Sequence, residues 1–470
     1  MNLFFECGVY PDVLKHSIVF PLHKKVSKTD ANNYRGIFLS SNIGKLIEKL
    51  VNKRLVEFLE TNDLVAKNQH GFTKGKSTTT AATELMSGIL SEITADNTVL
   101  VLFIDFTKAF DSCSHSLLLE KLEAFGVRGT CLQFFQSYLR NRTLSVRYTH
   151  QTRNECEIEM FTQESKSATV NSGVFAGTIL GPVLFNVFVN SLFKCLKNVR
   201  TTAYADDFAL VLSVNDPSLL QQTTCEVLGK LSVWSSKNGL KINASKTKYM
   251  LFNCKLMPAL NITLNGQALE HVKVFKYLGF FLEEKLCWTT HIDDLCQRLQ
   301  KIICLFRFLR HSFPKEHLFV FYFAYFESVV RYGCCFWGVD KKAKKVLILQ
   351  KRCLRTILFL KPRTSCRSYF QKHNIATVYN LIIFEICRLV HSNSGTIFKR
   401  NGDLHDYNTR CKTDIQIQTG TNNMQRFIIK IYNKLPLKIK SSSSFKSDIK
   451  KLLKDKSYYS FDEFLNDNLY

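Results

Sequence analysis

The hydrophobic positions of the chain recur at helical spacing in several stretches. Between residues 43 and 59 the apolar residues return every third or fourth position, which predicts an amphipathic helix with Asn42 as its N-cap. The run from 180 to 197 is apolar for most of its length and has Pro182 in its first turn, where proline is tolerated. The other helices predicted before residue 200 cover 78–93, 115–125 and 130–139.

Short apolar runs rich in β-branched and aromatic residues predict strands. The first, at 98–104, is apolar after Thr98 and is followed directly by Asp105. Runs at 201–204 and 208–214 are separated only by Ala205, Asp206 and Asp207, and that spacing is typical of a hairpin. Later strands are predicted at 246–252 and 272–282. Beyond about residue 290 the pattern is mostly helical and basic, so a mixed α/β part precedes an all-α part.

Composition and charge narrow the class of protein. Of 470 residues, 46% are hydrophobic and 22% charged, which is globular usage and excludes intrinsic disorder as the main state. The 64 Lys and Arg exceed the 39 Asp and Glu, which gives a net charge of +25. An excess of this size implies a polyanionic partner, either nucleic acid or acidic membrane. The alternative is a surface charged for solubility.

The cysteines and the apolar runs indicate the cellular compartment in which the protein is expected. The 16 cysteines are scattered and include no Cys-x-x-Cys pair, so a zinc ribbon has no support. The first residues lack the features of a signal peptide. Reduced thiols in the nucleus or cytoplasm are therefore expected, and secretion is not. The most apolar run, 318–326, is about half a membrane span and ends at Glu327, so no transmembrane helix is expected.

Three carboxylates carry the sharpest chemical signal. Asp105 and the pair Asp206 and Asp207 each follow an apolar strand into a turn, and neighbouring strands can bring them together. Clustered carboxylates repel one another unless a cation neutralises them, and Mg²⁺ prefers such oxygen ligands. Two ions roughly 3.5–4 Å apart would activate a 3′ hydroxyl and stabilise pyrophosphate, which is nucleotidyl transfer. Alternatively, a lone Asp-Asp pair is a solvated turn and Asp105 caps a helix.

The surroundings of these carboxylates resemble the catalytic motifs of reverse transcriptases. Asp105 opens the run Asp-Phe-Thr-Lys-Ala-Phe-Asp at 105–111, and the pair lies in Tyr-Ala-Asp-Asp at 204–207. Through further ordered motifs the chain is similar, over almost its entire length, to the polymerases of non-LTR retrotransposons of the jockey-like or long-interspersed-element kind. These motifs are residues 8–15, 24–25, 33–35, 69–72, 77–78, 173–185, 239–243, 246–247, 275–279, 349–352, 458–460 and 462–464.

The resemblance implies an α+β right-hand polymerase whose palm has an antiparallel sheet. It implies RNA-directed DNA polymerase activity, in which a DNA 3′ end is extended on an RNA template. The implied partners are the RNA template, a DNA primer or nicked target DNA and dNTPs, with no membrane. An endonuclease usually precedes this region in the family, and none is expected here. The implied domains are N-terminal fingers (1–95), palm with interleaved fingers segments (96–288), helical thumb (289–400) and a C-terminal helical extension (401–470).

The resemblance also assigns the catalytic residues. Asp105 and Asp206 would be the main ligands of two Mg²⁺ ions, for which Mn²⁺ is a substitute, with Asp207 as an accessory carboxylate. The backbone carbonyl of Phe106 would add an oxygen ligand. Lys246 resembles the lysine proposed to protonate pyrophosphate.

Further residues would contact the nucleotide and the nucleic acid. Phe110 falls where an aromatic steric gate favours dNTPs, although core packing is the alternative. The residues expected to bind the nucleotide are Lys24, Lys25, Arg35, Phe110 and Gly177. Those expected near primer or template are Gly71 and Phe72 in the fingers, Gly173 beside the new base pair, Tyr277, Leu278 and Gly279 in a primer-grip hairpin, and Lys344, Lys345, Lys351 and Arg352 along a phosphate track. The alternative for the last four is a solvated helix face.

The chain departs from the family pattern at a few positions. Phe175 and Ala176 stand where the family has Pro-Gln, Gly36 replaces a Pro, and Thr73 stands where Arg is frequent. None of these departures falls on a predicted metal ligand. One alternative is therefore a catalytically weakened or inactive retrotransposon relic that only binds nucleic acid. A second, an RNA-copying RNA polymerase, is disfavoured by Phe110 and by Tyr204 and Ala205.

Overall fold

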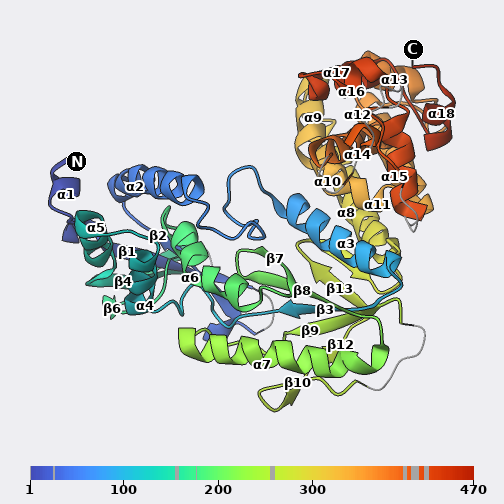
Figure 1. Cartoon of the computed structure of the whole chain (residues 1–470). Coiled ribbons are helices and arrows are strands. Elements are labelled where there is room, and N and C mark those ends of the chain that lie inside the picture. Colours follow the sequence, from blue (N-terminus) through green and yellow to red (C-terminus); the bar gives the residue numbers. More distant parts are fainter. Residues whose placement is uncertain are drawn as a thin grey trace. The chain divides into compact units, whose positions relative to one another are not determined.

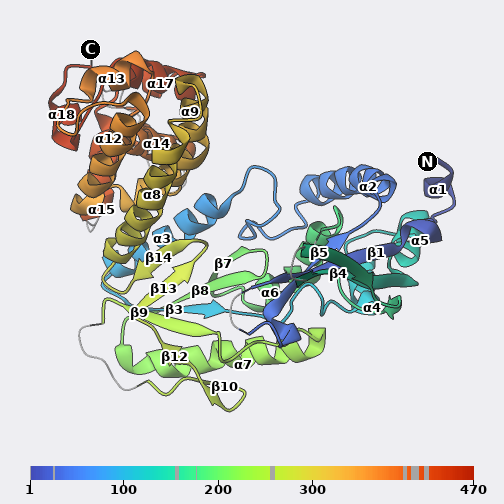
Figure 2. The ribbon, with the colours of Figure 1, turned by 180° about the vertical axis from the view of Figure 1, so that it is seen from behind.

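The chain divides into two compact units. The computed structural model describes residues 2–24, 27–153, 158–175, 177–254, 260–394, 398, 400–403, 412–417 and 423–469. The first unit comprises residues 1–88 and 98–271, and the second comprises residues 89–97 and 272–470. Figures 1 and 2 show that the first contains most of the β-structure, whereas the second is largely helical.

A five-stranded sheet with the order β12-β9-β3-β8-β7 forms the centre of the first unit. Its middle strand, β3, is buried along its whole length and pairs antiparallel with both β8 and β9. Ile104 lies opposite Phe208, so Asp105 follows at the edge where the β7–β8 turn projects. The strands are β3 (Thr98–Ile104), β7 (Arg200–Tyr204), β8 (Asp207–Val214), β9 (Lys248–Phe252) and β12 (Glu270–His271).

Helices cover one face of this sheet. Leu100, Leu102 and Ile104 alternate along β3 and point to the same face, as strand geometry requires. They share one apolar core with the helices, and Figure 1 shows α7 running beneath the sheet. These helices are α4 (His115–Ala124), α5 (Gly129–Leu139), α6 (Gly181–Cys195) and α7 (Leu220–Asn238). A short β10–β11 ribbon (Thr263–Leu264 and Gln267–Ala268) lies near α7.

A second sheet was not predicted from the sequence. In it β1 pairs antiparallel with β2 and parallel with β4, and β4 pairs antiparallel with β5 and β6. The strands are β1 (His16–His23), β2 (Tyr34–Leu39), β4 (Arg142–Arg153), β5 (Ile158–Glu164) and β6 (Ala168–Val170). β2 (YRGIFL) has only three consecutive apolar residues and β6 (ATV) is three residues long, so neither strand contains an apolar run long enough to predict it. The unit also contains α1 (Asn2–Glu6) and α2 (Asn42–Thr61).

The second unit begins with a hairpin. β13 (Val274–Tyr277) and β14 (Phe280–Glu283) are joined by Leu278 and Gly279, which both have positive φ, as a two-residue hairpin turn favours. Residues 272–282 were predicted as one strand. The structure has two strands instead, joined at Leu278 and Gly279, where the resemblance implied a hairpin.

Helices make up the rest of the second unit, and α14 (Val378–Ser392) lies at its centre. It is buried over most of its length and packs against α11, α12, α15 and α17. The other helices are α8 (Thr289–Leu309), α9 (Lys315–Phe321), the π-helical turn Tyr322–Glu327, α10 (Ser328–Arg331), α11 (Cys334–Trp337), α12 (Lys344–Leu358), α13 (Arg367–Lys372), α15 (Asn423–Asn433), α16 (Leu437–Lys440), α17 (Phe445–Lys454) and α18 (Phe461–Asn466).

The predicted α+β class and the all-α second part are confirmed. The remaining long helix, α3 (Thr78–Thr94), matches its predicted range within one residue. Helix α2 begins at Asn42, so Ser41 rather than Asn42 occupies the N-cap position. Among the described residues, no helix is long and apolar enough to span a bilayer.

Candidate active site

The β7–β8 turn presents two of the three predicted carboxylates. Tyr204 pairs with Asp207, which leaves Ala205 and Asp206 as a two-residue turn. Ala205 has a φ of +58°, a conformation that glycine adopts freely. For alanine this conformation costs about 1–2 kcal/mol, so the surroundings must stabilise it. Ala205 itself is only 6% exposed.

The three carboxylates act on one another electrostatically. Burial raises the pKa of Asp206, and it raises that of Asp105, on which the charge of Asp206 acts in the same direction. Loss of solvation, followed by repulsion from Asp206 and Asp105, raises the pKa of Asp207 to about 6. The Asp207 side chain as a whole is exposed, but nearby protein atoms displace water from its carboxylate. The structure therefore places the three acids within electrostatic range of one another.

Three of the predicted cations lie close enough to act on these acids. The charges of Lys246 and Lys24 both lower the pKa of Asp105. The charge of Arg35 lowers the pKa of both Asp206 and Asp207. At all three carboxylates, however, burial raises the pKa by more than these cations lower it, so the pKa is raised. Lys25, the fourth predicted cation, lies outside the described residues.

A loop preceding β9 places Lys246 near Asp105. The backbone N–H of Asn243 donates to the carbonyl oxygen of Asp105 at 2.8 Å. In return, the N–H of Asp105 donates to Thr247 Oγ1 at 3.3 Å. The amides of Lys246 and Thr247 donate to the Asn243 carbonyl, which closes the loop. The contribution of Asn243 and Thr247 was not predicted, because it depends on backbone contacts between distant segments.

Aromatic rings surround the end of β3. Phe106 is 5% exposed and its ring packs edge-on against Phe208 and Trp234, so only its backbone is suited to contact a ligand. Phe110 is partly buried and stacks on Phe185. Among the described residues its other ring neighbour is Phe72, which is 55% exposed, with the centroids 6.5 Å apart. The structure thus brings the predicted residues Phe72 and Phe110 together.

The two loop glycines make close backbone contacts. A side chain on Gly173 would lie 2.9 Å from the carbonyl oxygen of Asp111, and one on Gly177 would lie 2.6 Å from that of Phe38. Both have positive φ. Between them, Phe175 is 5% exposed and packs against Phe38 and the guanidinium of Arg142. Ala176 lies outside the described residues.

Glu48 was not predicted and connects α2 with the start of α6. Its Oε2 accepts hydrogen bonds from the backbone N–H groups of Ile179 at 2.6 Å and Leu180 at 3.3 Å. Such N–H groups at a helix N-terminus have no partner within the helix. Burial raises the pKa of Glu48, and the two hydrogen bonds act in the opposite direction. Glu48 thereby fixes the end of the loop that carries Gly173 and Gly177.

Within the second unit, the hairpin that was predicted as a primer grip packs against Tyr332. Tyr277 is 4% exposed, and the hydroxyl of Tyr332 donates to the carbonyl of Leu278 at 2.5 Å. The residues predicted for a phosphate track differ in availability. Lys344 and Arg352 are exposed, Lys345 pairs with Asp293 at 2.8 Å, and Lys351 lies over the ring of Tyr459.

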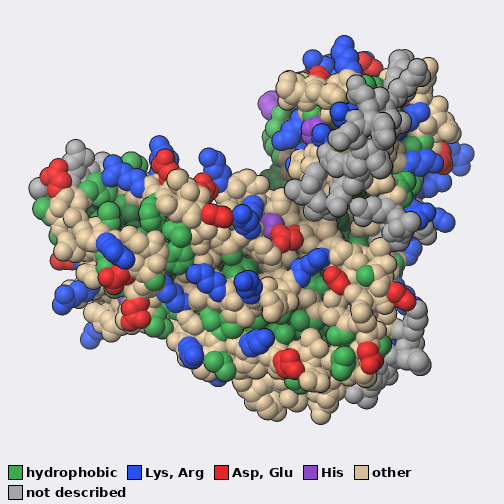
Figure 3. Space-filling model, viewed as in Figure 1, with side chains coloured by type: hydrophobic (Ala, Val, Ile, Leu, Met, Phe, Trp, Pro, Cys, Tyr) green, Lys and Arg blue, Asp and Glu red, His purple; other side chains and the backbone are tan. Residues whose placement is uncertain are grey.

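Basic side chains are spread widely. Figure 3 shows Lys and Arg scattered over both units on the face in view, not gathered in one patch. The charge excess alone therefore does not locate a nucleic-acid path, and the position of individual residues has to do so.

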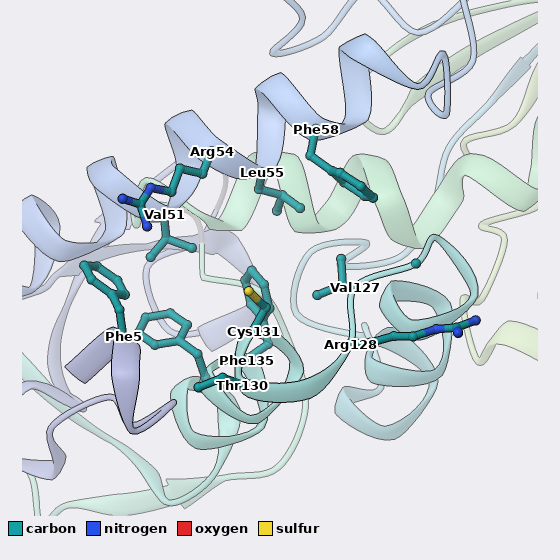
Figure 4. Close-up of a pocket in the computed structure, with 12 residues that line it drawn as sticks. Phe5, Val51, Arg54, Leu55, Phe58, Val127, Arg128, Thr130, Cys131 and Phe135 are labelled. Carbon is teal, nitrogen blue, oxygen red and sulfur yellow. The ribbon is translucent and has the colours of Figure 1, made fainter. Parts of the chain in front are cut away.

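An apolar pocket lies apart from the carboxylates. It has a volume of about 460 Å³ and is formed by α1, α2 and the start of α5. In Figure 4, Phe5, Val51, Leu55 and Phe135 lie around it, while the guanidinium of Arg54 extends away from its centre. It contains none of the predicted site residues.

The donor set at the turn fits a hard cation. Among the described residues, none of the carboxylates of Asp105, Asp206 and Asp207 forms an ion pair, although each has a raised pKa. In the same part of the chain no group of three or more Asp, Glu, His or Cys side chains lies close enough together to hold a metal ion. Carboxylate oxygens are the ligands that Mg²⁺ prefers, so these three side chains suit such a cation by donor type alone.

Comparison with known proteins places the site in a family. A family model described as reverse transcriptase (RNA-dependent DNA polymerase) matches residues 23–282. The matched segment contains Asp105, Asp206 and Asp207 together with Lys24, Arg35 and Lys246. The hairpin at 274–283 lies at its end.

Curated relatives come from mobile elements. The chain is 26% identical over 401 residues to a probable RNA-directed DNA polymerase from transposon BS of Drosophila melanogaster, covering 81% of this chain and 42% of the relative. It is 25% identical to the RNA-directed DNA polymerase from mobile element jockey of the same species, covering 76% and 39%. The chain thus spans about two fifths of these relatives. A solved telomerase from Candida albicans aligns with a TM-score of 0.39 at 13% identity, covering 94% of this chain and 65% of that one.

Proposed function

The chain belongs to the reverse transcriptase (RNA-dependent DNA polymerase) family, and from this premise we propose that it is the RNA-directed DNA polymerase of a non-LTR retrotransposon. It would extend a DNA 3′ end on an RNA template with dNTPs. The observation that carries this proposal is the convergence of Asp105, Asp206 and Asp207 with Lys24, Arg35 and Lys246. Acidic and basic groups in one place suit a site that holds both divalent cations and a triphosphate.

Asp105 and Asp206 would hold two Mg²⁺ ions, or Mn²⁺ in their place, with Asp207 as an accessory acid and the carbonyl of Phe106 as a further oxygen. Such ions, when bound, make a hydroxyl more acidic and stabilise the charge on phosphates. The raised pKa values support this assignment, because burial, together with carboxylate repulsion at Asp105 and Asp207, disfavours the charged forms, and an adjacent cation would stabilise them.

The basic residues would hold the nucleotide. Arg35 offers a planar fork of donors that suits bidentate phosphate contact, and Lys24 acts as a point charge. The primer 3′ hydroxyl would lose its proton to water, and its oxygen would attack the α-phosphorus. One P–O bond forms while the bond from the α-phosphorus to the oxygen that bridges to the β-phosphate breaks. Lys246, placed beside Asp105 by the Asn243 loop, would give its proton to the departing pyrophosphate. Phe110 would lie beneath the sugar and exclude a 2′ hydroxyl.

RNA template and DNA primer, or nicked target DNA, would be the nucleic-acid partners. Gly71, Phe72, Gly173 and Gly177 would approach the template and the new base pair by their backbone. Tyr277, Leu278 and Gly279 would hold the primer end, while Lys344, Lys345, Lys351 and Arg352 would contact duplex phosphates. The domain assignment into fingers (1–95), palm (96–288), thumb (289–400) and C-terminal extension (401–470) belongs to the same proposal.

A primer-extension assay tests this function. The purified chain is incubated with a DNA primer annealed to heteropolymeric RNA, Mg²⁺ and either dNTPs or rNTPs. We expect extension with dNTPs, and Asp206→Asn should lower the rate by at least about a hundredfold, as loss of a group that stabilises transition-state charge does. Extension that survives Asp206→Asn would remove that residue from the mechanism, and a preference for rNTPs would indicate an RNA polymerase.

The alternative, a relic that binds nucleic acid without copying it, gives a different result in the same assay. It predicts salt-dependent binding of the primer–template without extension. The packing of Phe175 against Phe38 and Arg142 supports retained activity, because the substituted loop residue is accommodated in the core.

A further inference from the structure

We propose that Gln69 is a positioning residue, whose side-chain amide holds the backbone of the Tyr204–Asp207 turn so that Asp206 and Asp207 keep their places beside Asp105. The inference rests on the proposed function in one respect only, namely that these acids serve catalysis. The hydrogen bonds between the Gln69 amide and the backbone of Ala205, here called the clamp, are a property of the fold and can be measured without activity.

The amide of Gln69 bonds both polar groups of one turn residue. Its Oε1 accepts from the backbone N–H of Ala205 at 3.0 Å, and its Nε2 donates to the carbonyl oxygen of Ala205 at 3.2 Å. The same Oε1 also accepts from the N–H of Gly71 at 2.9 Å. Gln69 is 1% exposed, so these bonds are shielded from competing water.

The bonded residue is the one whose backbone needs support. Ala205 has the left-handed φ of +58° in a turn where glycine would be unstrained. The peptide groups on either side of this torsion lead to Tyr204 and to Asp206. Because Gln69 fixes both the N–H and the carbonyl of Ala205, it restrains the direction in which Asp206 leaves the turn.

The segment that carries Gln69 is itself fixed in place. The N–H of His70 donates to the carbonyl of Ala203 at 2.7 Å, and the N–H of Ala203 donates to the carbonyl of Asn68 at 3.0 Å. A side chain on Gly71 would lie only 2.2 Å from the backbone nitrogen of Ala205. The segment therefore lies directly against the turn, and the amide of Gln69 has little freedom to move away.

Two substitutions of Gln69 and one matched control separate positioning from general stability. Gln69→Ala removes all three hydrogen bonds. Gln69→Glu keeps the acceptor but replaces the donor to Ala205 with a second oxygen. The control is Asn68→Ala, because the Asn68 amide donates to the carbonyl of Thr201 at 2.8 Å and thus joins the same two segments without contacting the turn.

The first measurement is hydrogen–deuterium exchange of peptides that contain residues 203–208. We expect Gln69→Ala to raise the exchange rate at the Ala205 amide at least about tenfold, since that amide loses its acceptor, whereas Asn68→Ala should not. Gln69→Glu should leave this amide close to wild type. Exchange at Ala205 that is unchanged in Gln69→Ala would overturn the clamp, whether or not the chain is a polymerase.

The second measurement is Mn²⁺ binding to the folded chain, together with steady-state primer extension. Gln69→Ala should bind Mn²⁺ about fivefold or more weakly and lose roughly 10- to 100-fold in kcat with little change in the KM for dNTP, because misplaced groups affect the chemical step. Asn68→Ala should match wild type in both. Faster exchange at Ala205 with wild-type Mn²⁺ affinity and kcat would overturn the positioning role. Absence of extension by the wild type would instead count against the proposed function, and the exchange result would still decide the clamp.

Discussion

The ring of Phe110 stacks on the ring of Phe185, with centroids 4.2 Å apart and planes inclined by 16°. Phe185 is fully buried in α6, whereas Phe110 is partly exposed. A ring that forms a wall against a sugar has to resist displacement, and this stack supplies that resistance from the core. Core packing and a steric gate are therefore compatible roles for Phe110.

Replacing the ring of Phe110 or of Phe185 with a smaller side chain should lower the selectivity for dNTPs over rNTPs. For Phe110→Val we expect the ratio of kcat/KM for dNTP over rNTP to fall by about tenfold or more, because space opens for the 2′ hydroxyl. Phe185→Leu should cause a smaller fall, since it leaves the Phe110 ring without its stacking partner. Single-nucleotide extension with each substrate measures this ratio.

The control for this prediction is Phe188→Leu. Phe188 is also fully buried in α6 and so suffers a similar loss of core volume, but it is not a ring partner of Phe110. If Phe185→Leu changes the ratio no more than Phe188→Leu does, the stack has no part in selecting the sugar.

Replacing Phe175 should cost stability. Its ring lies 5.1 Å from that of Phe38 and 5.0 Å from the Arg142 guanidinium, two of whose nitrogens have no hydrogen-bond partner in the described residues. Phe175→Ala should lower the free energy of unfolding by about 3 kcal/mol, through a cavity and the exposure of a buried charge. Urea unfolding measures this, with Met160→Ala at a 67% exposed position as control.

The same position distinguishes the intact enzyme from the relic. Phe175→Pro introduces the residue typical of the family, but it also removes the ring from Arg142. We therefore expect extension per folded molecule to stay level or fall. A rise in extension would instead show that the departure at this loop had weakened the polymerase.

Glu48 should stabilise the fold mainly because its oxygen accepts hydrogen bonds, and less because of its negative charge. Glu48→Ala leaves the part-buried N–H of Ile179 and the buried N–H of Leu180 without this acceptor and should cost roughly 1–3 kcal/mol, whereas Glu48→Gln keeps an acceptor and should cost less. The native pKa of Glu48 is raised, so its protonation favours the folded state at low pH and this contribution is lost as pH rises through that pKa. Unfolding measured across this range should show a shallower pH dependence for Glu48→Gln, and Glu57→Gln on the exposed face of α2 is the control.

The sequence was sufficient to predict the features that local pattern determines. The apolar run of β3, the turn with Asp206 and the helix α6 all follow from contiguous residues, and their bounds differ little from those predicted. The resemblance then supplied Lys24 and Arg35, which no local pattern would have separated from an exposed basic face.

The features that were missed depend on partners distant in sequence. Gln69 and Ala205 are separated by 136 positions, and Glu48 and Ile179 by 131. A glutamine in a loop or a glutamate in a basic helix has no local signature of such a contact. The sheet containing β2 was missed for another reason, because Arg35 and Gly36 leave only the three consecutive apolar residues 37–39 in that strand.

His291 should make the second unit sensitive to acid. Its side chain lies among the rings of Phe280, Trp288 and Trp337, and burial lowers its pKa from 6.5 to about 4, with Arg298 acting in the same direction. Below pH 6.5 the unfolded chain therefore binds a proton that the folded unit resists. The contribution of His291 to the free energy of unfolding is fully present above pH 6.5. As the pH approaches 4, the free energy of unfolding should fall by about 3 kcal/mol. His291→Phe should remove this part of the slope in urea unfolding, while His317→Gln, at an exposed position, should keep it. Equal slopes in His291→Phe and wild type would mean that His291 takes up its proton without unfolding.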